Sequence, residues 1–115
     1  MITLTLPFPP SANRYWRNVK GRTLKSAEAR DYALQVGWLC RNADIEPLTG
    51  DISLELRIYF PNKRGDLSNR IKVVEDALNA HAYVDDKQVK RLYAERYIDK
   101  NNPRIELLIM EIETP

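Results

Sequence analysis

The stretch from Pro61 to Val89, PNKRGDLSNRIKVVEDALNAHAYVDDKQV, combines a helical repeat with a group of acidic residues. Its apolar positions follow one another at steps of four, three and four residues, namely Leu67, Ile71, Val74 and Leu78. This spacing predicts an α-helix with one buried face. Polar residues fall on the other side of the same helix, namely Ser68, Asn69, Lys72, Asp76 and Asn79. The stretch therefore predicts a helix that carries a polar stripe above its core face.

Acidic residues flank this helix at both ends. Asp66 precedes the first apolar position, where a carboxylate can cap the unpaired N–H groups of the first turn and interact with the helix dipole. Asp85 and Asp86 follow a break in the pattern and open a second regular segment. If this pair folds back beside Asp66, two or three carboxylates meet next to one lysine, which is a ligand set for a hard cation such as Mg²⁺. Caps and turns remain the structural alternative for all three aspartates.

The rest of the chain alternates between strand and helix patterns. Alternating or continuous apolar residues predict strands over 2–6, 52–59, 89–98 and 105–112, the last two forming a hairpin. Ser26 is a typical N-cap for a helix that runs to about Asn42. This order predicts one α+β domain over residues 1–115, with two layers: two helices on one face of a mixed sheet of about four or more strands.

Composition limits the class of protein. The chain has 115 residues, 43% hydrophobic and 30% charged, which is typical of a folded globular domain. No apolar run approaches the ~20 residues of a membrane span, and the start MITLTLPFPP does not predict a secretory signal. The single Cys40 excludes an internal disulfide and favours a reducing, cytoplasmic location. With one histidine, His81, a zinc site of the usual kind is also excluded.

Basic residues are concentrated in two places although the net charge is only +2. A turn-rich stretch with a tight turn expected at Gly21 holds Arg14, Arg17, Lys20, Arg22, Lys25 and Arg30. Tyr15 and Trp16 in this stretch can stack on nucleic-acid bases or pack under a loop. A second group surrounds the acidic motif: Lys63, Arg64, Arg70 and Lys72. The pattern is typical of an anionic substrate brought to a metal, with a solvated surface as the alternative.

The acidic motif supplies the residue types that phosphodiester hydrolysis needs. The reaction requires charge neutralisation on the phosphoryl group, an activated water and a stabilised leaving oxygen, and carboxylate-bound Mg²⁺ with a nearby lysine can provide these. The residues in question are Asp66, Lys72, Asp85 and Asp86, with Asp76 as a further carboxylate. Cys40 lies on a predicted buried stripe and His81 has no visible partner, so neither is expected to take part in catalysis.

Several segments resemble the signature of the RusA family of Holliday-junction resolvases. They are Asp66-Leu67-Ser68-Asn69, Lys72, Asp76-Ala77-Leu78, Tyr83-Val84-Asp85-Asp86-x-Gln88-Val89, and Pro9-Pro10-Ser11-x-Asn13-Arg14-x-Trp16-Arg17. The resemblance covers almost the whole chain in the right order. It implies a homodimeric, Mg²⁺-dependent endonuclease, with Mn²⁺ as a substitute, encoded by a phage or prophage. Such an enzyme resolves four-way DNA junctions by paired symmetric nicks.

The resemblance also assigns roles to individual residues. It implies metal-binding aspartates at Asp66 and Asp86 with Asp85 close by, and a catalytic lysine at Lys72. Asn69 and Asp76 are expected to support these groups. Contacts to DNA are implied for Asn13, Arg14, Trp16, Arg17, Lys20, Arg22, Lys63 and Arg64.

One position departs from the family motif. The motif reads Asp-Leu-Asp-Asn, and here Ser68 replaces the second aspartate. A serine hydroxyl is neutral and a poor ligand for a hard dication, so the site loses one negative charge. Two hypotheses follow: a junction endonuclease that works with the remaining aspartates, or a catalytically deficient protein that still binds DNA junctions. A structural or interaction domain with no nucleic-acid role is the third.

Overall fold

The computed structural model describes residues 1–12 and 16–113, with backbone alone for 16–19 and 22–24. Within these residues it contains two α-helices, six strands and the 3₁₀ turn η2. In chain order they are β1 (Ile2–Pro7), β2 (Trp16–Val19), β3 (Arg22–Lys25), α1 (Ala27–Asn42), β4 (Ile52–Phe60), α2 (Ser68–Leu78), the 3₁₀ turn η2 (Asp86–Gln88), β5 (Val89–Ile98) and β6 (Arg104–Glu111).

Four of the strands form a mixed sheet in the order β1-β6-β4-β5. β4 and β5 are parallel, and α2 forms the crossover between them, as a parallel pair requires. β6 pairs antiparallel with β1 on one side and with β4 on the other. The expected hairpin of β5 and β6 is therefore wrong. β6 buries Ile105, Leu107 and Ile109 and takes a central position, whereas the more charged β5 takes the edge.

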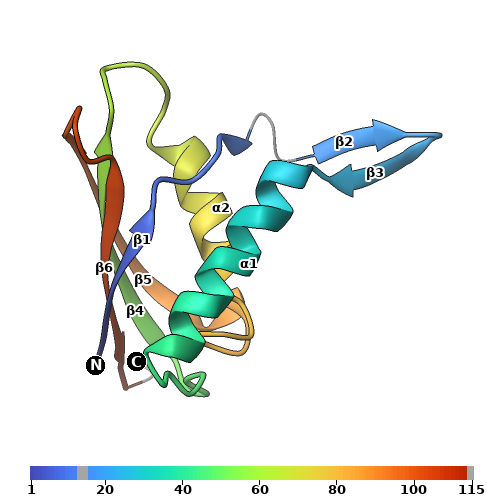
Figure 1. Ribbon diagram of the computed structural model, residues 1–115. Helices are drawn as coiled ribbons and strands as arrows, with labels where there is room; N and C mark the ends of the chain where they lie inside the picture. The colour runs from blue at the N-terminus through green and yellow to red at the C-terminus, as the bar shows by residue number, and fades with distance from the viewer. Residues whose placement is uncertain (13–15, 114–115) are drawn as a thin grey trace.

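The helices cover one face of this sheet, so the predicted two-layer α+β architecture is confirmed (Figure 1). Apolar side chains at alternate positions of β4 are almost fully buried, namely Ile52, Leu54, Leu56, Ile58 and Phe60. From α2, Val74 and Leu78 join this core, while Leu67 and Ile71 pack at its rim. The helix and strand periods in the sequence thus correctly predicted which side chains face the core between the sheet and the helices.

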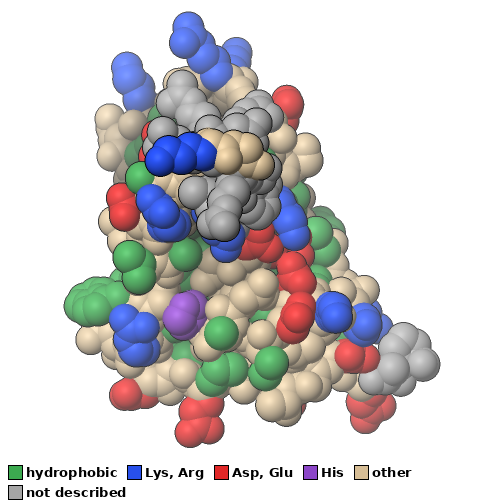
Figure 2. All heavy atoms as spheres, turned by 90° about the vertical axis from the view of Figure 1, so that its right-hand side faces the viewer, with side chains coloured by type: hydrophobic (Ala, Val, Ile, Leu, Met, Phe, Trp, Pro, Cys, Tyr) green, Lys and Arg blue, Asp and Glu red, His purple; other side chains and the backbone are tan. Residues whose placement is uncertain are grey.

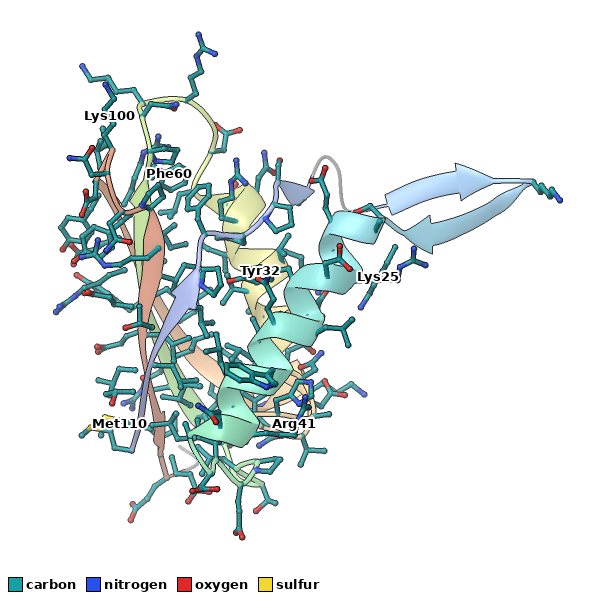
Figure 3. All side chains as sticks on the ribbon, in the orientation of Figure 1. Lys25, Tyr32, Arg41, Phe60, Lys100 and Met110 are labelled. Atoms are coloured by element: carbon teal, nitrogen blue, oxygen red, sulfur yellow. The ribbon has the colours of Figure 1, made fainter. Side chains whose placement is uncertain are left out.

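α1 begins and ends where the sequence indicates. The hydroxyl of Ser26 accepts a hydrogen bond from the N–H of Ala29 at 3.2 Å, which confirms the predicted N-cap. Tyr32 points from α1 toward the sheet (Figure 3), and its hydroxyl donates to the carbonyl of Pro7 at 2.8 Å. Cys40 is buried in the same helix, as expected. Among the described residues, neither helix is long and apolar enough to cross a membrane.

The basic stretch before α1 forms an antiparallel hairpin rather than an irregular loop. β2 and β3 pair only with each other, and the hairpin projects away from the sheet and helices (Figure 1). The predicted turn is confirmed, because Lys20 and Gly21 connect the strands with φ angles of 51° and 77°. Such two-residue turns need left-handed backbone, which glycine adopts readily. Strands of four residues leave too little alternation to be recognised from sequence.

Candidate active site

Lys72 lies at the centre of a group of charges formed by α2 and η2. Its ammonium Nζ is 3.2 Å from Oδ1 of Asp76, one turn along the helix, and 3.6 Å from Oδ2 of Asp86. The hydrogen bond with Asp76 raises the pKa of Lys72, so its ammonium stays protonated. The Asp85-Asp86 pair thus folds back onto α2, as the sequence analysis considered. It meets Lys72 in the middle of the helix rather than Asp66 at its start.

The two adjacent aspartates have different environments. Asp85 accepts a hydrogen bond from the N–H of Lys87 at 3.0 Å. This bond, together with a hydrogen bond to Asp86, holds the pKa of Asp85 below its usual range. The hydrogen bond to Asp85 and partial burial raise the pKa of Asp86. A proton taken up by the pair therefore resides on Asp86, the carboxylate that faces Lys72.

Gln88 fixes the loop that presents this pair. Its Oε1 accepts from the N–H groups of Val84 and Asp85 at 2.8 and 2.9 Å, and its Nε2 donates to the carbonyls of Leu48 and Gly50, both at 2.8 Å. The Asp85 and Gln88 side chains also form a reciprocal capping box around η2. The pattern Asp-x-x-Gln is the sequence signal of such a box. From the sequence, Gln88 was noted only as part of a motif, and this role was not predicted.

Glu75 is a further acidic residue of the group that the sequence analysis missed. It lies three residues after Lys72 and is half-buried. Burial raises the pKa of Glu75, the Lys72 ammonium opposes this, and the Asp86 and Asp76 carboxylates add to it. The hydroxyl of the buried Tyr83 donates to the backbone carbonyl of Glu75 at 2.7 Å. A spacing of three residues from Lys72 on a helix was the available signal.

Asp66 lies in the loop before α2 and outside this group. Its Oδ2 accepts from the side-chain amide of Asn69 at 3.5 Å, and the N-cap of the helix is Leu67, which makes no side-chain cap. The capping role considered for Asp66 is therefore wrong. Within residues 1–12 and 16–113, no three His, Cys, Asp or Glu side chains lie close enough together to hold one metal ion. Asp66, Asp85 and Asp86 are thus not gathered into one set, and Ser68 sits exposed one turn before Lys72.

The loop from Pro61 to Asp66 is held by Arg96 of β5. The Arg96 guanidinium donates to the carbonyls of Asn62 and Arg64, both at 3.0 Å, and to that of Gly65. It also stacks over the ring of Phe60 at 3.7 Å. The backbone carbonyls of the loop face Arg96, and the side chains of Lys63 and Arg64 are exposed to solvent. Arg96 was not predicted from the sequence, because only the fold brings it to this loop.

The other basic residues divide into three cases. Arg70 does not join the acidic group, because its guanidinium donates to the carbonyl of Pro9 and packs over the ring of Phe8 at 4.7 Å. Lys20 is exposed at the tip of the hairpin. The expected DNA contacts at Asn13 and Arg14 lie outside the described residues, as do the side chains of Trp16, Arg17 and Arg22.

Acidic side chains gather right of centre on the face viewed along the hairpin, with basic side chains above and beside them (Figure 2). The Lys72 group combines a protonated lysine with carboxylates from a helix and a turn. An exposed basic loop precedes the same helix. A fold and a site of this kind fit the class of enzymes that act on phosphodiesters of nucleic acids.

Comparison with known proteins identifies the family. The family model described as endodeoxyribonuclease RusA matches residues 7–110. A protein of Escherichia coli strain K12 named crossover junction endodeoxyribonuclease RusA is 35% identical over 113 residues, 96% of this chain and 94% of the relative. A protein of the same name from Enterobacteria phage 82 is 34% identical over 112 residues, 95% of this chain and 93% of the relative. The chain belongs to the RusA endodeoxyribonuclease family.

Proposed function

We propose that this chain is a Mg²⁺-dependent endonuclease that resolves four-way DNA junctions by paired symmetric nicks as a homodimer. The position of Lys72, 3.2 Å from Asp76 and 3.6 Å from Asp86, is the observation that carries this proposal. It supplies a fixed positive charge beside carboxylates in a chain that matches an endonuclease family over residues 7–110. The names of the relatives, which describe crossover junction endodeoxyribonucleases, support the choice of substrate.

The adjacent Asp85 and Asp86 fit a Mg²⁺ ion by their chemistry. Mg²⁺ prefers oxygen ligands and is commonly held by one or two carboxylates, with waters and substrate phosphates completing its shell. Asp66 is assigned as a further ligand from its place in the family motif. When bound, the ion would polarise a phosphoryl oxygen and lower the pKa of a bound water, and Mn²⁺ would serve in its place.

The chain's own residues orient and neutralise the phosphate. Lys72 is more than half exposed and remains protonated, so it can approach a phosphoryl oxygen and stabilise the charge that develops there. Asp76 holds the ammonium by an ion pair one helical turn away. Asn69 donates to Asp66 and thereby supports its orientation.

Two basic elements are the proposed DNA contacts. Lys63 and Arg64 lie exposed on the loop that Arg96 holds, and Lys20 is exposed at the tip of the projecting hairpin. Contacts of this kind neutralise phosphates, so binding should weaken steeply with salt. A homodimer suits a four-way junction because both have twofold symmetry. Acting on DNA with one buried, reduced Cys40, the protein is proposed to work in the cytoplasm.

Ser68 supports a second candidate function, a DNA-junction-binding protein without cleavage. Residue 68 lies one turn before Lys72, where the family motif has an aspartate. A hydroxyl at this position offers no charge to a hard dication. Its neutrality also removes one repulsive charge facing the phosphates, so affinity for junctions would be retained or increased.

Nicking of a synthetic four-way junction tests both candidates. The wild-type protein and Ser68→Asp are compared with Mg²⁺ and with Mn²⁺, beside a linear duplex of the same sequence. Cleavage by both proteins supports the endonuclease. Cleavage by Ser68→Asp alone identifies the wild-type chain as a junction binder. Absence of cleavage and of junction-selective binding in both proteins would refute both functions.

Asp86→Asn separates catalysis from binding in the same assay. Removal of this carboxylate should abolish nicking and leave gel retardation of the junction measurable, because the basic loop is unchanged. Asp44→Asn is a matched control, since it makes the same change at an exposed carboxylate just after α1. Full cleavage by Asp86→Asn would remove Asp86 from the assigned site.

A further inference from the structure

β5 leaves one side unpaired along the edge of the sheet. It is ten residues long and pairs with β4 on one side, and no described strand covers its other side. Exposed edges of this length readily pair with another strand, and natural proteins usually shorten or cover them. The opposite edge, β1, has only six residues and ends at Pro7. β5 is therefore the edge strand with more free backbone N–H and C=O groups, and the better candidate for pairing with another strand.

Large apolar side chains on β5 are exposed on both faces of the sheet. Leu92 and Ile98 lie beside the buried Leu54 and Phe60 on the helix-covered face, yet are 46% and 51% exposed. Tyr93 and Tyr97 lie on the open face and are 61% and 37% exposed. Exposure on both faces at once is expected of a strand that continues into a further strand. It is not expected of one that ends the sheet in water.

The charges on the open face of β5 are self-complementary. Along this face the strand reads Arg91, Tyr93, Glu95 and Tyr97. An antiparallel second β5 with the twofold axis at Tyr93 places Arg91 opposite Glu95 twice and Tyr93 opposite itself. Opposite charges at facing positions stabilise a strand pair, whereas like charges destabilise it.

Other registers lack this match. An axis at Glu95 places two carboxylates face to face, and an axis at Ala94 leaves both charges opposite tyrosines. On the helix-covered face, the Tyr93 register sets Lys90 opposite Arg96. The guanidinium of Arg96 is held by the carbonyls of residues 62, 64 and 65, so its position is fixed by the loop, and the like charges of this pair are a cost that the two Arg91–Glu95 pairs have to exceed.

We propose that two copies of the chain join through the outer edge of β5, antiparallel about Tyr93, into one continuous sheet. The proposal rests on the homodimer of the proposed function and names its surface. An antiparallel edge pair has its twofold axis perpendicular to the sheet, so the helices of both copies lie on the same face. Both Lys72 groups then face the same side, where one DNA junction can reach them. β5 begins directly after η2, so each acidic pair is anchored to the joined strands.

Disulfide trapping tests the register. Tyr93→Cys in a Cys40→Ala background has one cysteine, and facing residues of antiparallel strands have Cα atoms about 4.5–5.5 Å apart, within reach of a disulfide. Mild oxidation should convert most of the protein to a covalent dimer of twice 13.4 kDa. Thr5→Cys in the same background is the control, because Thr5 is exposed on the same face at the far edge of the sheet. It should remain monomeric on a non-reducing gel.

Charge reversal provides an independent test. Arg91→Glu should weaken dimerisation about tenfold or more in sedimentation equilibrium, because each dimer contains the pair twice. The double variant Arg91→Glu/Glu95→Arg should restore most of the affinity. Lys100→Glu, with the same change of charge outside β5, should leave it unchanged.

The outcomes distinguish this proposal from the proposed function. Cross-linking at position 93 with rescue by the double variant supports the β5 surface. A dimer that neither cross-links at position 93 nor responds to charge reversal refutes this surface while the homodimer stands. A monomer at micromolar concentration refutes both, and nicking activity is decided separately by the junction assay.

Discussion

Replacing Gln88 with alanine should loosen the loop that presents the acidic pair. The side chain forms four hydrogen bonds, each with a backbone group. Its Oε1 accepts from the N–H groups of Val84 and Asp85, and its Nε2 donates to the carbonyls of Leu48 and Gly50. The four distances lie between 2.8 and 2.9 Å, which is good geometry. Alanine cannot replace any of them.

The expected loss follows from how exposed these bonds are. A hydrogen bond contributes a net ~0.5–1.5 kcal/mol to stability. The bonds to Val84 and Gly50 are exposed, so water can replace them, whereas those to Asp85 and Leu48 are partly buried. Counting the buried pair fully and the exposed pair weakly, Gln88→Ala should lower the free energy of unfolding by about 2 kcal/mol. For a domain of this size the Tm should fall by roughly 8 °C.

Urea denaturation and amide hydrogen exchange measure the two parts of this effect. Denaturation gives the loss of stability. Exchange should accelerate most at the N–H of Asp85, which loses its acceptor, and less at that of Val84, which keeps the backbone carbonyl of Leu48 at 3.3 Å. Gln35→Ala is the matched control, because Gln35 is exposed on α1 and its change should stay within ~0.5 kcal/mol.

A second substitution separates the two ends of the amide. Gln88→Glu keeps an oxygen acceptor for Val84 and Asp85 but places a carboxylate against the carbonyls of Leu48 and Gly50. It should destabilise at least as much as alanine. If Gln88→Ala matches Gln35→Ala in stability and leaves the exchange of both amides unchanged, Gln88 does not hold this loop.

Three further predictions concern other parts of the site and sheet. Arg96→Lys should lower stability by about 1–2 kcal/mol in urea, because an ammonium cannot bind three carbonyls and stack over Phe60 together; unchanged stability would contradict this. The hydrogen bond from Arg104 lowers the pKa of Asp99, so its contribution to stability is present above about pH 4 and is lost as pH falls through the lowered value. Asp99→Asn should therefore flatten the acid side of the Tm–pH curve, and an unaltered curve would show that Asp99 does not contribute to the pH dependence. Ser68→Asp should raise metal-free stability by about 0.5–1 kcal/mol by calorimetry, and a lower Tm would show that a carboxylate at the start of α2 is not stabilising.

Elements with a regular burial period were predictable from sequence. The alternation in β4 and the repeat in α2 indicated their core faces because side-chain direction follows directly from strand and helix geometry. The order of strands was not predictable in the same way. β5 and β6 are neighbours in sequence, but pairing is decided by which strand buries more apolar surface. The result is that β6 lies inside the sheet and β5 at its edge.

The site was predictable in its residue types but only in part in its grouping. Lys72 and Asp76 meet as their spacing on the helix indicated, and Asp86 joins them because η2 returns to the middle of α2. Asp66 does not join this group, since it lies in the loop before α2, six residues before Lys72. Arg96 and the Nε2 of Gln88 bind backbone carbonyls far away in sequence, and no local pattern contains such partners.

Ser68 is not explained by the stability of α2. The first turn of this helix has no acidic residue and its N-cap makes no side-chain bond, so a carboxylate there would interact favourably with the unpaired N–H groups. It would also lie four residues before Lys72, the favourable order for an ion pair on a helix. Both effects favour aspartate over serine in the folded, metal-free protein. The stability of the metal-free fold therefore does not explain the serine. If Ser68→Asp changes cleavage or binding of a junction, a loss cannot be attributed to weaker folding, because the aspartate is expected to stabilise the helix.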